Sequence, residues 1–119
     1  MLLGGLIWFL WHIPLVLILP QQVQYTAVEI VLNLIILGLG SVCTFIYLAY
    51  VYIKSESVFV AAIAHVTLNN SARSFSYYVE IKNQLLANFG LAITMVIVVL
   101  LLYFTKQTIV FKEYFSKDK

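Results

Sequence analysis

Long apolar stretches without charged side chains dominate this chain, and short polar connections separate them. Four stretches contain no Asp, Glu, Lys or Arg: residues 1–28, 30–53, 57–72 and 83–105. Because a bilayer core of roughly 30 Å requires about 20 consecutive apolar residues in a helix, three of these stretches are long enough to span a membrane. The third stretch is shorter and contains polar side chains. We therefore expect it to form a buried or partly penetrating helix within a bundle.

Turn and capping residues set the expected ends of the helices. Pro20 and the glutamines after it end the first helix, and Ser55 is a candidate N-cap for the third. The connection between the third and fourth helices is polar and aromatic, and its Tyr77 and Tyr78 suit a membrane interface. The expected helices cover residues 2–19, 27–53, 57–69 and 84–105.

The predicted fold is all-α: a polytopic membrane helical bundle with three spanning helices plus one shorter buried helix. The bundle occupies residues 1–105, and a short charged tail follows in 106–119. The small residues "GLGS" at 38–41 offer a place where another helix can approach closely. Cys43 is the only cysteine, so it can form neither an internal disulfide nor a cysteine-only metal site. We expect it to act as a small apolar side chain in helix packing.

Composition supports a membrane location. Of the 119 residues, 63% are hydrophobic and 10% are charged, the mean hydropathy is +1.00, and an ordinary soluble domain has about 25% charged residues. The net charge of +2 and the lack of a basic stripe argue against nucleic acid as a partner. Membrane lipid is the expected partner. The sequence gives no indication of an oligomeric state.

The N-terminal stretch is interpreted as a spanning helix rather than a signal peptide. It has no Lys or Arg before the apolar run, it is longer than the usual ~7–15 residues, and it contains His12 and Pro14. Since residue 2 is already apolar, we expect the chain to begin within a larger protein. Five lysines (Lys54, Lys106, Lys112, Lys117 and Lys119) would share one side of the membrane, opposite Arg73 and Lys82. The positive-inside tendency then places the C-terminus in the cytoplasm.

Polar residues interrupt the apolar stretches at two places. Within a membrane segment, polar residues usually face a bundle interior or a water-filled cavity. In "WFLWHIP", Pro14 leaves the carbonyl of Leu10 without its helical donor and loosens the turn that carries His12. In "HVTLN", His65 and Asn69 are four residues apart and share one helix face. An alternative remains open for each motif. His12 could lie at a helix kink and be hydrogen-bonded by a neighbouring helix, and Asn69 could cap the end of its own helix.

Two histidines and an asparagine allow three kinds of chemistry if their side chains meet. Imidazoles are common transition-metal ligands, so His12 and His65 with a carboxylate and water would form a hydrolytic site for zinc or another divalent metal. Without a metal, the same groups could activate a water and bind an oxyanion. Facing histidines could also ligate a haem.

The motifs resemble those of the Abi or CPBP intramembrane proteases, which include the type II CAAX prenyl endopeptidases. "WFLWH" at 8–12 is similar to the family's FxxxH motif, with Trp8 in place of Phe, and "HVTLN" at 65–69 matches HxxxN. The family's paired-glutamate motif, EExxxR, is absent, so the resemblance is to the C-terminal half of the family. It covers residues 1–105.

The resemblance implies an endopeptidase in a bacterial cell membrane that acts on a membrane-associated or prenylated peptide. His12 would activate the water, and His65 and Asn69 would stabilise the oxyanion; some members of the family are described as metalloproteases. Without the glutamates, we expect the chain alone to be weakly active, as a truncated member or one that needs a partner. The alternative is a non-catalytic helical membrane protein, such as an immunity factor or transporter fragment, whose polar residues are packing contacts.

Overall fold

The computed structural model describes residues 2–18, 26–78 and 84–116, and side chains at 3–14, 18, 26–71 and 88–116. Over these ranges the secondary structure is helical, which confirms the all-α prediction. The helices are α1 (Leu2–Ile18), α3 (Ala27–Ser55), α4 (Val58–Tyr78), α5 (Gln84–Phe104) and α6 (Ile109–Ser116). The predicted turn after residue 19, Lys82, Lys117 and Lys119 lie outside the described residues, as do the side chains of Arg73, Tyr77 and Tyr78.

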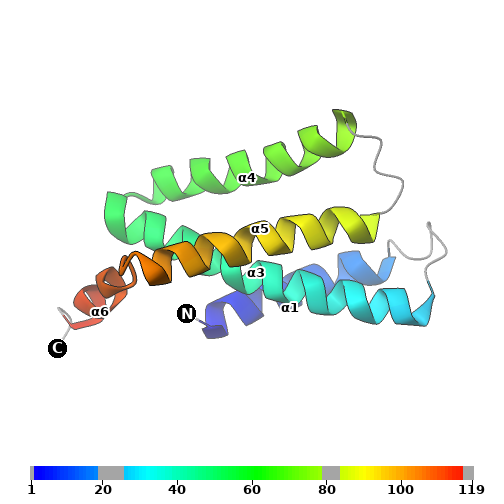
Figure 1. Cartoon of the computed structure of the whole chain (residues 1–119), viewed down its shortest axis with the longest axis horizontal. Coiled ribbons are helices and arrows are strands. Elements are labelled where there is room, and N and C mark those ends of the chain that lie inside the picture. Colours follow the sequence, from blue (N-terminus) through cyan, green and yellow to red (C-terminus); the bar gives the residue numbers. More distant parts are fainter. Residues whose placement is uncertain (1, 19–25, 79–83, 117–119) are drawn as a thin grey trace.

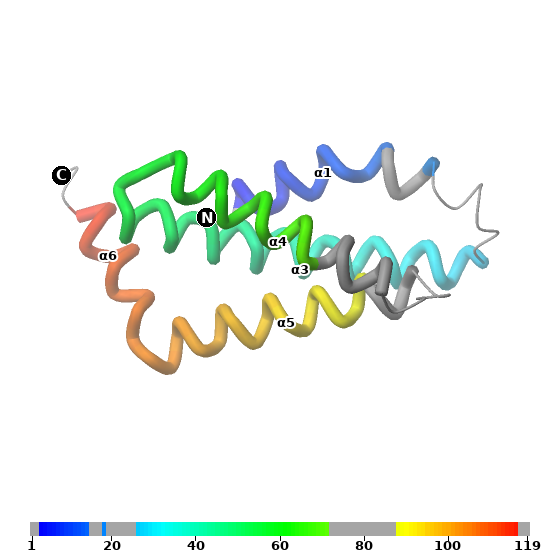
Figure 2. The backbone as a smooth tube through the Cα atoms, turned by 90° about the horizontal axis from the view of Figure 1, so that it is seen from above, coloured from blue at the N-terminus to red at the C-terminus, as the bar shows by residue number. Residues whose placement is uncertain are grey.

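α3 is the helix on which the others pack. Helices α1, α4, α5 and α6 each contact it, and these pairings are the extensive ones within the described ranges. In Figure 1, α4 forms a layer over α3. Figure 2, seen from above, places α1 and α5 on opposite sides of α3. A helix of 29 residues is about 44 Å long at 1.5 Å per residue, longer than the hydrocarbon core of a bilayer.

Defined caps fix both ends of α3. At the start, the N–H and hydroxyl of Thr26 each donate to Glu29 Oε2 at 2.8 Å, and the Glu29 N–H donates to Thr26 Oγ1 at 3.3 Å. This reciprocal capping box satisfies backbone donors that the helix leaves free. At the other end, Glu56 is left-handed with φ 51°, and its N–H donates to the Tyr52 carbonyl at 2.8 Å. The chain reverses there and enters α4.

Ser57, rather than Ser55, caps the start of α4, so the sequence-based choice of cap was wrong. The Ser57 hydroxyl oxygen accepts the Val60 N–H at 3.4 Å. Ser55 still belongs to α3, where its hydroxyl donates to the Val51 carbonyl at 2.8 Å. Its oxygen also accepts the Ser57 N–H at 3.3 Å, which ties the two helices together across the turn.

The predicted short buried helix is longer and more exposed than expected. α4 has 21 residues and continues past residue 69 to Tyr78. The segment contains polar side chains but no Gly or Pro, so no backbone constraint ends the helix where the polar run begins. Its half-buried positions follow one stripe along the face toward α3, and no described residue of α4 is fully buried. The stripe consists of Ala61, Ala64, His65 and Leu68.

Small residues set the spacing of the helices around α3. A Cβ added at Gly5 of α1 would lie 2.8 Å from the Val42 backbone, and one at Gly4 would overlap the Phe45 ring. The predicted role of "GLGS" is confirmed, because a Cβ at Gly40 would lie 3.5 Å from Ala92 Cβ of α5. Helices with small residues at their interface can bring their backbones close together.

The buried side chains of the described residues belong to α3 and α5, which pack against each other. Cys43 of α3 and Ala92 and Met95 of α5 are buried, as expected for a cysteine that acts as a small apolar side chain. Asn33 is also buried, with 7% of its surface exposed. The Asn88 Nδ2 donates to Asn33 Oδ1 at 2.8 Å, so an amide pair joins the two helices. No local pattern in the sequence predicts this pair, because each asparagine stands alone in its apolar run.

The charged tail, which was not expected to be helical, contains the helix α6. After α5 the chain forms a Schellman turn, in which the N–H of Gln107 donates to Leu102 O at 2.9 Å and the N–H of Lys106 donates to Tyr103 O at 3.0 Å. Lys106 takes the left-handed conformation of this turn, with φ 58°. The turn bends the chain by 71° into α6.

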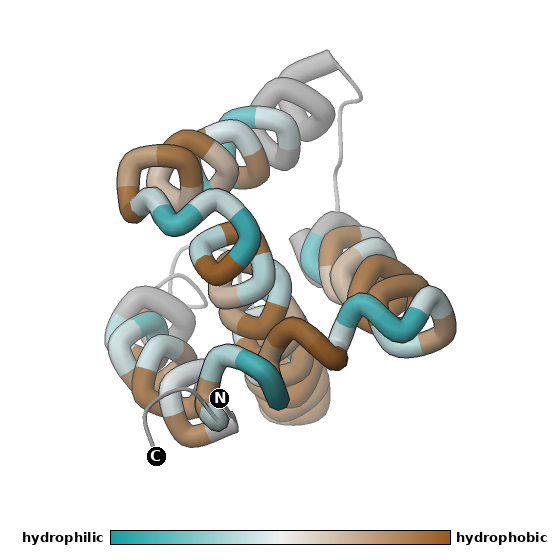
Figure 3. The backbone as a smooth tube through the Cα atoms, turned by 90° about the vertical axis from the view of Figure 1, so that its left-hand side faces the viewer, coloured by the Kyte–Doolittle hydropathy of each residue, from teal (hydrophilic) through white to brown (hydrophobic). Residues whose placement is uncertain are grey.

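Within the described residues, one helix is long and apolar enough to cross a membrane, namely α3. The segment Asn88–Phe104 and α6 count as a second candidate only if the bent pair is one broken span. The apolar parts Leu3–Pro14 of α1 and Val58–Ser71 of α4 are shorter than a usual span. Large apolar side chains are nevertheless exposed on every helix, and Figure 3 shows apolar positions on the outward sides of the bundle.

Replacing Gly5 by alanine should separate α1 from α3, whereas the same change at Gly90 should be tolerated. The new methyl group at Gly5 meets backbone, and we expect a loss of about 1–3 kcal/mol in stability. A Cβ at Gly90 would meet nothing within 4 Å, and removing a helical glycine favours the helix by up to about 1 kcal/mol. Thermal unfolding in lipid nanodiscs, followed by circular dichroism, measures both. Equal stability of the two variants would contradict the close crossing.

Candidate functional site

His12 lies on α1 with its ring held by its own helix. Its Nδ1 is 2.8 Å from the Trp8 carbonyl oxygen. Since a carbonyl can only accept, Nδ1 carries the proton, and Nε2 is left with its lone pair. The ring is exposed rather than enclosed by a neighbouring helix. An imidazole whose second nitrogen is fixed by a backbone carbonyl has the arrangement usual for a base or a metal ligand.

His65 and Asn69 form the hydrogen-bonded pair that their spacing suggested. The Asn69 Nδ2 lies 3.0 Å from His65 Nε2 on the same face of α4. The amide nitrogen donates, so Nε2 accepts and Nδ1 carries the ring proton. The capping alternative for Asn69 was wrong, because α4 continues through this position to Tyr78. The side chain therefore serves His65 and not the end of a helix.

Trp8 brings the two polar sites together. Its ring centroid is 6.3 Å from that of His12 and 4.9 Å from that of His65, and the indole meets the His65 ring edge-on at 84°. Phe45 of α3 packs against the same indole at 6.2 Å in a T-shaped contact. Side chains from α1, α3 and α4 thus meet at one tryptophan. Each histidine is a neighbour of Trp8, and no direct contact between the two imidazoles is seen.

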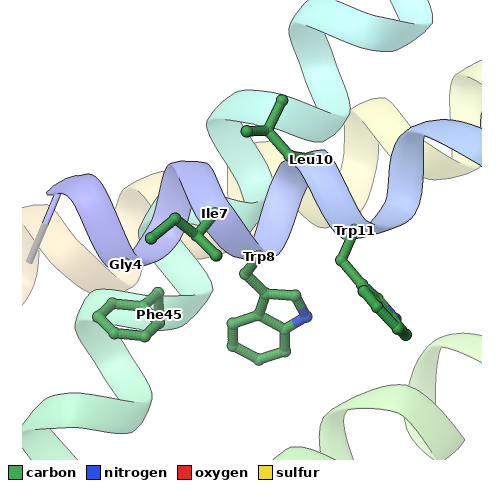
Figure 4. A pocket seen from close by; sticks show the side chains of 6 residues that line it. All are labelled: Gly4, Ile7, Trp8, Leu10, Trp11 and Phe45. Carbon is green, nitrogen blue, oxygen red and sulfur yellow. The ribbon is translucent and has the colours of Figure 1, made fainter.

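An open apolar groove lies beside this tryptophan. It has a volume of about 590 Å³ and is lined by Gly4, Ile7, Trp8, Leu10, Trp11 and Phe45. Figure 4 shows Trp8 and Trp11 projecting from α1 on the same side, with Phe45 next to Gly4. Trp11 is 83% exposed. The groove could accept an apolar chain beside the tryptophan that has both histidines as neighbours. In the sequence alone, Trp8 stands out only as a variation in a motif.

The residues present do not by themselves form a metal site. Within the described ranges, no three His, Cys, Asp or Glu side chains lie close enough together to hold an ion. Nε2 of His65 is also occupied by the Asn69 amide. Glu29, the described glutamate nearest to His12 in the sequence, uses its carboxylate to cap the start of α3. A zinc ion here would need ligands beyond His12 and His65.

Comparisons with known proteins add no relative. No family model, no curated protein and no solved structure matches the chain.

Both histidines should be protonated on Nδ1 when neutral, which is the less populated tautomer of free histidine. Nitrogen-15 NMR of the labelled protein distinguishes the two ring nitrogens. The change Asn69→Ala should return His65 to the Nε2-protonated form and leave His12 unaffected, because the donor to His65 Nε2 is lost. Thr67→Ala, on another face of α4, is the matched control and should change neither ring. A neutral His65 that carries its proton on Nε2 in the unaltered protein would contradict the assigned pairing.

Proposed function

We propose that this chain carries the histidine part of an intramembrane endopeptidase site of the CPBP type, acting on a membrane-associated or prenylated peptide. The observation that supports this most strongly is the meeting of the two motifs at Trp8. Its ring contacts His12 from its own helix and His65 from α4, and His65 pairs with Asn69. Residues that the resemblance links in function are therefore neighbours in space. The groove along α1 offers room for an apolar substrate chain.

In the proposed reaction, His12 acts on the water. Its Nε2 has a free lone pair, while Nδ1 is anchored to the Trp8 carbonyl. Nε2 accepts a proton as the water oxygen attacks the peptide carbonyl, and then returns the proton to the leaving amine. His65 and Asn69 stabilise the oxyanion that develops on the carbonyl oxygen: Asn69 donates its second amide N–H to it, and Nε2 of His65 orients the amide by accepting the first. Asn69 keeps one amide N–H for this purpose while the other holds His65.

In the family, a paired-glutamate motif supplies a carboxylate to the site, and this sequence lacks that motif. No glutamate in the sequence has an adjacent acid, and EExxxR is absent. A base without its carboxylate partner loses several orders of magnitude in rate when the groups act as a unit. We therefore propose that the chain is weakly active alone and is completed by a carboxylate from a partner. A zinc ion bound through His12 and His65 would need further ligands from the same partner. No step of the proposed reaction requires a zinc ion.

The proposed setting is a bacterial cell membrane with the C-terminus in the cytoplasm. α3 supplies one membrane-crossing helix by length and apolar composition, and α1 and α5 are the two further spans that we propose. The exposed apolar side chains of α1 and α5, for example Leu10 and Leu101, support this, since they would lie against lipid.

A second candidate is a non-catalytic helical membrane protein. It is favoured by one specific feature: each polar group of the site is already bonded within its own helix, His12 to the Trp8 carbonyl and His65 to Asn69. Such local pairs can satisfy polar side chains in a membrane without any further role.

Complementation separates the two candidates. The chain is co-expressed with the N-terminal half of a CPBP protease that carries EExxxR but lacks its own C-terminal half, and cleavage of that protease's substrate is followed by mass spectrometry. We expect cleavage only when both parts are present. His12→Ala and His65→Ala should each reduce the rate at least about 100-fold, as expected for loss of a proton-transfer group or of the group that orients the oxyanion donor.

Co-purification of the two parts shows whether they assemble, and Thr67→Ala should leave the rate unchanged. Cleavage that persists in the His12→Ala variant, or an assembled pair that does not cleave, would favour the non-catalytic candidate.

A further inference from the structure

Exposed aromatic and basic side chains gather at the end of the bundle where α5 turns into α6. Tyr103 and Phe104 are 65% and 74% exposed, and Tyr114 and Phe115 are 38% and 55% exposed. Lys54, Lys106 and Lys112 are exposed at the ends of α3, α5 and within α6. In the end-on view of Figure 3, hydrophilic positions collect at the turns of this same end. Aromatic rings together with lysines are typical of the boundary between bilayer and water.

The bend after α5 sets the direction of α6. The two helices meet at 71° through the left-handed Lys106. If α3 and α5 run along the membrane normal, α6 crosses the end of the bundle at a shallow angle to the membrane surface. A short amphipathic helix in that position lies in the interface, with one side on the acyl chains and the other in water.

The contacts of α6 show which of its sides rests on the bundle. Phe111 packs toward Tyr50 of α3, with ring centroids 6.4 Å apart, and the Tyr50 hydroxyl donates to Gln107 Oε1 at 3.1 Å. Phe115 follows Phe111 by one turn on the same side of the helix, but it is exposed. Glu113 is about 200° away from Phe115 around the helix. The side of α6 that rests on the bundle therefore continues beyond it as an apolar surface.

The geometry points to α6 as an interfacial helix that binds anionic phospholipids, with Phe115 among the acyl chains and Lys106 and Lys112 on the lipid phosphates. The acids at this end, Glu56 and Glu113, are fewer than its described lysines. In the sequence, Lys117 and Lys119 follow α6 with one acid between them. Basic residues next to a membrane helix are attracted to the negative surface of a leaflet that contains anionic lipid. The partner is thus a bilayer surface rather than a protein.

Site-specific labelling of the full chain in vesicles tests this inference. A fluorophore is placed at position 115 (Phe115→Cys) or at position 113 (Glu113→Cys) in a Cys43→Ser background, and quenching by acrylamide, which is uncharged, is measured. The vesicles are phosphatidylcholine with or without phosphatidylglycerol. We expect quenching at 115 to be at least about threefold weaker than at 113. Phosphatidylglycerol should weaken the quenching at position 115 about twofold further. The double change Lys106→Gln with Lys112→Gln should remove this effect of phosphatidylglycerol.

Equal quenching at the two positions in both kinds of vesicle would place α6 in water and overturn the inference. If position 115 is protected from quenching but phosphatidylglycerol does not change that protection, the assignment of anionic lipid as the ligand is overturned. Circular dichroism of each variant must match that of the unaltered chain, so that a change in quenching reports position and not unfolding.

Discussion

The close crossing of α1 over α3 at Gly4 and Gly5 determines where the candidate site residues lie. Side chains larger than hydrogen would meet the Val42 backbone and the Phe45 ring. With the helices this close, Phe45 lies against Gly4 and reaches Trp8, one turn further along α1. Trp8 then meets His65 of α4, which packs on another side of α3. The spacing between the backbones of α1 and α3 thus positions the Trp8 ring, and both histidines lie beside this ring.

The polar groups of the candidate site are satisfied within their own helices, and this has a functional consequence. An unsatisfied polar group away from water costs free energy, so a histidine or asparagine must find a partner. His12 uses the carbonyl of Trp8, and His65 uses Asn69. Both arrangements leave at least one donor or acceptor on each side chain for a ligand. The same geometry therefore fits a stable resting state and, with a further carboxylate, the proposed reaction.

Much of the fold could be predicted from the sequence, because apolar run length and charge position are strong signals. The ends of α3 and α5 agree with the expected 27–53 and 84–105 within about two residues. α4 and α6 could not be predicted in the same way, since polar residues from Asn69 onward and in the tail look like loops unless their contacts with α3 are known. For the site, the spacing of four predicted the pairing of His65 with Asn69. The central position of Trp8 depends on a contact between helices that no local pattern encodes.

The contact between Trp8 and His65 is the central claim, and solid-state NMR of the chain in lipid bilayers tests it most directly. The sequence has two tryptophans and two histidines, so Trp11→Phe with His12→Gln leaves one of each. With both ring types isotopically labelled, the centroid separation of 4.9 Å predicts a strong cross-peak between the indole and imidazole rings. A matched sample with His65→Gln in place of His12→Gln should give a weaker peak, because His12 lies at 6.3 Å. Absence of the Trp8–His65 peak in a folded sample would contradict the account.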